Sequence, residues 1–193
     1  MRVPPSPPIL LGRPSPAHPS RSPTSAPIGS SQTRLLQSYN QSCDVRPAAV
    51  AEEIDQCLRL RYQVYCLENP FEDPAAHASE RETDRYDRHS IHSLLRHKPT
   101  GQPIGTVRLI LPRPGAPQGS LPIQTLCPSA RFANPARLPW AGTAEVSRFC
   151  ISKAARQRCF GPPGLDGPLA DGDKELMPLF TLGLIRGLGA VVN

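Results

Sequence analysis

Residues 90–111, SIHSLLRHKPTGQPIGTVRLIL, carry the pattern that decides the fold. Two apolar-bearing runs, 90–96 and 103–111, flank the turn sequence KPTG at 98–101. Proline and glycine between two such runs are typical of a β-hairpin, because they supply the dihedral angles of a tight turn. The sequence therefore predicts two antiparallel strands here.

Patterns on both sides of the hairpin complete the layout. Apolar residues recur at three- and four-residue spacing from about residue 48, which predicts a helix that begins near Pro47 and ends at Asn69-Pro70. The remaining predictions are a polar loop at 70–88, an irregular connection at 112–141, a third strand at 143–152, and a helix at 174–188 weakened by Pro178 and Gly183. This order predicts an α/β (α+β) fold with a mostly antiparallel sheet and flanking helices.

The start of the 193-residue chain differs in composition from the rest. Residues 1–30 contain nine prolines and no acidic residue, and their one apolar patch, Ile9-Leu10-Leu11, is too short for a signal peptide. We expect a disordered Pro/Ser-rich tail at 1–43 and a folded domain at 44–193. The chain has no apolar run of the roughly 20 residues that a membrane span needs. Six cysteines without a CxxC pair favour reduced thiols and a cytoplasmic location.

The net charge of +6 hides a strong segregation of charge along the chain. Residues 44–87 carry −6, whereas residues 88–160 carry +10 with Glu145 as their only acid. A basic stretch of this kind fits nucleic acid, an acidic protein or a phosphate-bearing cofactor, or consists of solvated arginines. A nucleic-acid-binding or non-catalytic interaction module is the non-enzymatic alternative. Against nucleic acid, Phe132, Trp140 and Phe149 are too widely spaced for a stacking surface.

Charged residues inside apolar strands are informative, because a buried charge without a partner is costly. Arg108 lies in GTVRL, and Glu145 and Arg148 lie in EVSRF. Upstream, Arg61 and Tyr65 are four residues apart and share one face of the predicted helix. The charges inside the strands either pair with one another across the sheet or line a cleft.

Four motifs occur in a distinctive order: RLRYQVYCLENPFE (59–72), ETDRYDRHSIHSLL (82–95), IGTVRLILP (104–112) and EVSRFCISKAARQR (145–158). Together they resemble the acyltransferases associated with PEP-CTERM/exosortase systems. They are similar, more distantly, to the N-acyl amino acid synthases and the acyl-homoserine-lactone (autoinducer) synthases. The resemblance covers about residues 48–158. It implies the fold of GCN5-related N-acetyltransferases and the transfer of a fatty acyl group to a small amine such as an amino acid.

The resemblance also implies roles for individual residues. Carried over from the autoinducer synthases, the catalytic positions are Glu145, Arg148, Asp84 and Asp87, and the substrate-binding positions are Arg61, Tyr65 and Arg108. Tyr65 stands where those synthases usually have Phe. The turn at 155–161 matches the pyrophosphate loop of acetyltransferases only loosely, which favours an acyl carrier protein over coenzyme A as donor. Arg156 and Arg158 are the expected donor contacts, and neither a metal nor a permanently bound cofactor is implied.

The chemistry of acyl transfer singles out one carboxylate independently. The attacking amine must be neutral, and an α-amino group has a reference pKa of about 7.7–8.0, so a nearby carboxylate should accept a proton. Glu145 is the only acid between Asp87 and Asp166, which makes it the candidate base. The alternative is an ion pair of Glu145 with Arg108 or Arg148. Because Glu145 and Arg148 differ in strand parity, a shared site requires a β-bulge between them.

Two other enzyme classes are open alternatives. A metal site could draw on Asp84, Asp87, His89 and His92, although the two histidines would point to opposite faces of a strand. Cys66 or Cys150 could act as a nucleophile, although their apolar surroundings favour the neutral thiol.

Two further expectations concern the donor and the end of the chain. Arg131, Arg137, Arg156 and Arg158 lie outside the predicted strands and are the expected contacts of an acidic acyl carrier protein. The family fold is expected to have another strand after the helix at 174–188. The sequence therefore predicts a domain that is incomplete at its C-terminus, with an open sheet edge and poor solubility.

Overall fold

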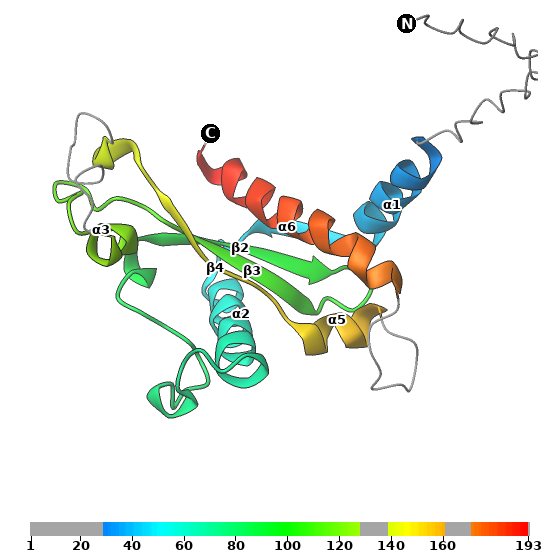
Figure 1. Cartoon of the computed structure of the whole chain (residues 1–193), viewed down its shortest axis with the longest axis horizontal. Coiled ribbons are helices and arrows are strands. Elements are labelled where there is room, and N and C mark those ends of the chain that lie inside the picture. Colours follow the sequence, from blue (N-terminus) through cyan, green and yellow to red (C-terminus); the bar gives the residue numbers. More distant parts are fainter. Residues whose placement is uncertain (1–28, 128–138, 161–170, 193) are drawn as a thin grey trace, which may run out of the picture.

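The computed structural model describes residues 29–127, 139–160 and 171–192 and contains one four-stranded antiparallel sheet (Figure 1). The strands follow the order β1-β2-β3-β4 and are β1 (Cys43–Pro47), β2 (Ser90–His97), β3 (Pro103–Ile110) and β4 (Glu145–Ile151). The hairpin β2–β3 and the strand β4 confirm the predicted strands. The fold is α+β, as the order of the predicted elements indicates.

The structure corrects the prediction for residues 29–47. A helix, α1 (Gly29–Ser42), lies where the composition predicts the end of a disordered tail, and residues 1–28 lie outside the described residues. Pro47 does not begin a helix but ends β1, where it pairs with Ser93 of β2. Proline is tolerated there because β1 is an edge strand and needs no second hydrogen-bonding partner.

Helices cover the two faces of the sheet (Figure 1). The first face carries α2 (Ala51–Tyr62), which continues as a π-helix (Gln63–Glu68) up to the predicted stop at Asn69-Pro70. The opposite face carries α6 (Asp171–Val192), which confirms the predicted C-terminal helix and extends it. Among the described residues, no helix is long and apolar enough to cross a membrane.

The apolar core lies between the sheet and α6. Phe180, Leu184 and Leu188 of α6 are buried in one cluster with residues of β2 and β3. Gly183 does not interrupt α6. A Cβ there would clash with the Tyr39 hydroxyl, so the glycine allows α1 and α6 to approach closely.

Strand parity separates this core from the polar side of the sheet. Val107 and Leu109 of β3 belong to the apolar core, whereas Arg108 between them points to the face that carries α2. Two short helices flank β4 in the sequence: α3 (Pro122–Leu126) precedes it, and α5 (Lys153–Phe160) follows it and adds Ala155 to the apolar core. The predicted irregular connection at 112–141 thus contains α3, and its residues 128–138 are not described.

Candidate active site

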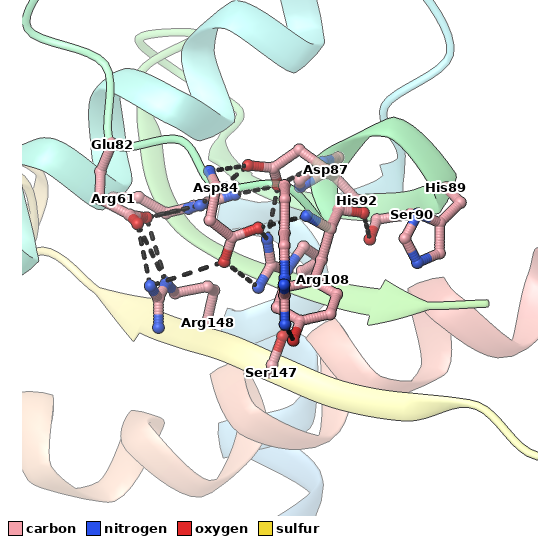
Figure 2. A network of polar contacts seen from close by, with 12 residues as sticks. Arg61, Glu82, Asp84, Asp87, His89, Ser90, His92, Arg108, Ser147 and Arg148 are labelled. Atoms are coloured by element: carbon pink, nitrogen blue, oxygen red, sulfur yellow. Dashed lines mark hydrogen bonds and ion pairs between the residues drawn. The ribbon is translucent and has the colours of Figure 1, made fainter. Parts of the chain in front are cut away.

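A buried network of charged side chains lies between α2 and the sheet (Figure 2). The acids come mainly from the segment 82–89, which runs into β2. Within it, the Asp84 side chain accepts a hydrogen bond from the backbone N–H of Tyr86, and the Asp87 side chain accepts one from the backbone N–H of Asp84. These local bonds fix the segment in a conformation that directs its carboxylates toward the sheet.

Arg61 is the fully buried member of this network at the end of α2. Its Nε donates to Glu82 Oε2 at 2.6 Å, and its Nη1 donates to Asp87 Oδ1 at 2.7 Å. Glu82, with 1% of its side chain exposed, was not singled out as a site residue by the sequence. The only signal for it was its place in the acidic motif ETDRYD.

Arg108 reaches the same acids from β3. Its Nη1 donates to Asp84 Oδ1 and to Asp87 Oδ1, both at 2.7 Å, and its Nη2 donates to Asp84 Oδ2 at 2.9 Å. Its Nε donates to the hydroxyl of Ser147 in β4 at 3.0 Å. Arg108 therefore links the acidic segment to two adjacent strands.

Arg148 joins the network because β4 is irregular at that point. Arg108 pairs with Ser147 and Thr106 pairs with Cys150, so two residues of β4 oppose one residue of β3. Arg148 has a φ of 49°, in the left-handed region that non-glycine residues rarely adopt. This bulge directs its guanidinium to the face that carries Arg108 and Ser147. There it donates to Glu82 at 3.0 Å and to Glu72 at 3.1 Å, as Figure 2 shows for Glu82.

Tyr65 supports the bulge from the π-helix. Its hydroxyl donates to the carbonyl oxygen of Phe149 at 2.8 Å, and its ring lies 5.6 Å from the guanidinium carbon of Arg148. A phenylalanine at this position would lack the first of these contacts. Desolvation by burial raises the pKa of Tyr65 to about 12, so the hydroxyl stays protonated and donates.

The network keeps its carboxylates ionised. Burial by itself raises the pKa of Asp87, but the hydrogen bonds and charge of Arg61, with those of Arg108, outweigh burial and lower the pKa to about 2. The same balance lowers the pKa of Asp84, with Arg108 as the dominant partner. Both carboxylates are therefore weak bases near neutral pH. They are suited to hold guanidinium groups or a cationic substrate rather than to accept a proton.

His92 is a buried neutral member of the network. It lies opposite Arg108 in the β2–β3 pair, with Nε2 3.7 Å from Asp87 Oδ1 and with Nδ1 lacking a hydrogen-bond partner among the described residues. Desolvation and the positive charges of Arg61 and Arg108 lower its pKa to about 4. In the sequence analysis, His92 was a candidate only for a metal site. Within the described ranges, no group of three or more His, Cys, Asp or Glu side chains is arranged to hold a metal ion.

Glu145 lies apart from the network, at the start of β4. Its Oε2 accepts a hydrogen bond from the backbone N–H of Ile123 at 2.9 Å, near the N-terminus of α3. The alternative of an ion pair with Arg108 or Arg148 is wrong, because those side chains pair with Asp84, Asp87, Glu82 and Glu72. The predicted bulge exists, but it lies at Arg148 and Phe149 rather than between Glu145 and Arg148. It brings Arg148, and not Glu145, to the other charges.

The N-terminus of α5 is occupied by a carboxylate of the chain itself. Glu68 accepts hydrogen bonds from the backbone N–H of Lys153 at 2.7 Å, from the N–H of Ala154 at 3.1 Å, and from the hydroxyl of Ser152 at 2.6 Å. The N–H of Ala155 donates to Ser152 Oγ at 3.0 Å. All free N–H groups of the first turn are thus satisfied internally. No pattern in the sequence indicated this role of Glu68.

The two predicted donor contacts on α5 differ in exposure. Arg158 is exposed and, with Ser152 and Ala155, lines a cavity of about 260 Å³, whereas Arg156 is half-buried. The other two predicted contacts, Arg131 and Arg137, lie outside the described residues. The alternative cysteine nucleophiles are both buried, and desolvation raises the pKa of Cys66 and raises that of Cys150 to about 12, which disfavours the thiolate.

Comparison with known proteins agrees with this architecture. Residues 60–160 match the family model of the acetyltransferase (GNAT) domain, and this match spans just over half of the chain. Strands β2, β3 and β4 and the bulge in β4 lie within the matched region, whereas β1 precedes it. The chain therefore belongs to the GNAT family of acyltransferases. No curated protein and no solved structure gives a significant match.

Proposed function

We propose that the chain transfers a fatty acyl group from the phosphopantetheine thioester of an acyl carrier protein to a small amine such as an amino acid. Membership of the GNAT family supports acyl transfer. The resemblance of the four motifs to PEP-CTERM-associated acyltransferases and autoinducer synthases supports a fatty acyl donor and a small amine acceptor. The contacts of Glu68 are the observation that favours an acyl carrier protein over coenzyme A as the donor.

The argument for the donor rests on the N-terminus of α5. A helix N-terminus with free N–H groups is a favourable site for a pyrophosphate, and coenzyme A carries one. In this chain the N–H groups of Lys153 and Ala154 already donate to the Glu68 carboxylate. An incoming pyrophosphate would lack these donors and would meet a negative charge. A carrier-borne phosphopantetheine has one phosphodiester and no pyrophosphate, so it avoids this conflict.

In the proposed reaction, the neutral amine attacks the thioester carbonyl. A C–N bond forms, the C–S bond breaks, the amine loses a proton, and the carrier leaves as the thiol. Glu145 is our candidate acceptor of that proton. One of its oxygens is held by the Ile123 N–H and the other has no hydrogen-bond partner among the described residues. Asp84 and Asp87 keep their negative charges and position the guanidinium groups of Arg61 and Arg108.

Glu145→Gln tests the proposed base. The glutamine has the same size, and its amide oxygen can accept the hydrogen bond from Ile123, but it cannot accept a proton. We expect turnover to fall roughly 10²–10⁴-fold with an unchanged melting temperature. Glu52→Gln removes the same charge from an exposed position on α2 and should leave turnover unchanged. Equal turnover in both variants would remove Glu145 from the mechanism.

The donor is tested by comparing acylated carrier protein with acyl-coenzyme A of the same chain length. We expect a higher kcat/KM for the carrier protein and a KM that rises with added salt. Arg158→Glu should raise the KM for the carrier protein, whereas the matched Arg34→Glu on α1 should not. A preference for acyl-coenzyme A would contradict the argument from Glu68. Mass spectrometry of lipid extracts from cells that express the chain would then identify the acylated amine.

A further inference from the structure

The segment 82–89 that supplies acids to the network also forms one wall of a separate cavity. Its residues Arg85, Tyr86, Arg88 and His89, together with Arg113 and Gly119, line a space of about 420 Å³. His89 is directed away from Arg61 and Arg148 in Figure 2. One short segment thus points its carboxylates to the network and its basic side chains to this cavity.

The cavity has positive charge without compensation. None of the described residues that line it is acidic. Arg88 and Arg113 are exposed, and their side chains form no hydrogen bond or ion pair with any described residue. Arg85 donates to the Tyr86 hydroxyl at 2.7 Å and its guanidinium carbon lies 4.8 Å from that ring, which leaves its charge unpaired.

The neighbouring acids do not supply the missing negative charge. Asp84 and Asp87 are in the same segment, but their oxygens accept hydrogen bonds from Arg61, Arg108 and backbone N–H groups. Three arginines around one cavity repel one another, and a bound anion would relieve that repulsion.

The walls of the cavity are held at a fixed separation. His89 Nε2 lies 3.0 Å from the carbonyl oxygen of Ser120, and Ser120 is buried. Between Arg113 and Ser120 the loop turns at Gly115 and Gly119, whose positive φ angles of 73° and 71° suit glycine. The site is therefore largely formed before a ligand arrives, which lowers the entropic cost of binding.

We propose that this cavity binds a phosphate-bearing small molecule. A guanidinium group presents paired N–H donors that match two phosphate oxygens, and several such groups fit a multiply charged anion. The cavity volume falls within the range of small-molecule sites, about 300–1,000 Å³, and exceeds the volume of phosphate alone, so it has room for an organic group. This inference does not depend on the proposed acyl transfer.

The test measures the binding of inorganic pyrophosphate to the full chain by calorimetry at constant ionic strength. A double variant, Arg88→Gln with Arg113→Gln, removes two charges from the cavity. Its matched control, Arg34→Gln with Arg186→Gln, removes two exposed charges from α1 and α6. We expect the control to bind like the wild type and the cavity variant to bind at least about tenfold more weakly. Acetate at the same ionic strength should bind much more weakly to all three proteins.

NMR chemical shifts locate the binding. Pyrophosphate should shift the backbone amide resonances of residues 85–89 and 113–120. Equal affinity of all proteins, or shifts centred on α5, would overturn the proposal. Vesicles containing phosphatidylglycerol test a lipid headgroup as the source of phosphate. Vesicle binding that requires Arg88 and Arg113, in the absence of pyrophosphate binding, would also overturn it, because the ligand would then be a membrane surface.

Discussion

The two faces of the sheet are built on opposite principles, although alternate residues of one strand, β3, contribute to both. On one face Val107 and Leu109 join the apolar cluster that contains Phe180 and Leu184 of α6. On the other face Arg108 lies among ionised carboxylates. Apolar burial has no preferred direction, whereas each buried charge needs partners at defined positions. The apolar face should therefore tolerate changes that keep its volume, and the charged face should tolerate few changes of any kind.

The largest effect is expected for Arg61→Met on the charged face. The substitution keeps apolar volume but removes one guanidinium from Glu82, which is buried, and from Asp87. We expect the free energy of unfolding to fall by about 3–5 kcal/mol, measured by urea denaturation. In the control Arg59→Met, the pair with Asp55 is partly exposed and should contribute at most about 1 kcal/mol. Similar costs for both variants would refute the difference between the two faces.

On the apolar face, Leu184→Ala should cost about 3 kcal/mol by leaving a cavity in the core. Leu182 lies on the same helix with 63% of its surface exposed, and Leu182→Ala should cost less than about 0.5 kcal/mol. Leu184→Met, which nearly keeps the volume, should retain most of the stability that Leu184→Ala loses. No single polar residue should retain the stability lost in Arg61→Met. Failure of Leu184→Met to recover stability would show that this face also requires a particular shape.

Acid should weaken the charged face in two stages. The pKa of His92 is lowered from 6.5 to about 4, so the unfolded chain takes up a proton below pH 6.5 while the folded chain does not. The free energy of unfolding should therefore fall as pH drops from 6.5 to 4, by up to about 3 kcal/mol. Asp87, with a pKa lowered from 3.8 to about 2, adds a loss below pH 4.

Urea denaturation at several pH values measures this dependence. His92→Gln should reduce the slope between pH 4 and 6.5 but keep the loss at lower pH, and the remaining slope is expected from His97, whose pKa is also lowered by burial. His77→Gln, outside the network, should keep both. An unchanged slope in the His92 variant would assign the pH dependence to other groups.

The smallest effect on stability is expected for Glu68→Ala at the border of the charged face. Loss of the contacts to Lys153 and Ala154 should cost about 1–2 kcal/mol, whereas Glu52→Ala, at an exposed position, should cost less than about 0.5 kcal/mol. The same Glu68 variant should bind coenzyme A more tightly than the wild type in a competition assay. Unchanged affinity for coenzyme A would separate the structural role of Glu68 from the choice of donor.

Local patterns in the sequence determined much of the α+β fold. The turn at 98–101 and the apolar runs around it predicted β2 and β3, because turn residues and strand periodicity act over a few neighbours. The sequence also marked Arg108 and Arg148 as charges that need partners, since a charge in an apolar strand is costly without one, and both side chains form ion pairs in the structure.

The identity of each partner was decided by the tertiary structure. Glu82, Glu68 and Ser147 are ordinary polar residues in the sequence, and they acquire roles only because the bulge, the π-helix and the segment 82–89 bring them to distant groups. Glu145 shows the converse. Its isolation among basic residues made it the candidate base, with an ion pair to Arg108 or Arg148 as the alternative. That ion pair does not form, because distance along the chain does not report distance in space and other acids pair with Arg108 and Arg148. Sequence specifies which charges must be compensated, whereas only the packed chain specifies by which partner, because electrostatic pairing depends on separation and direction in three dimensions.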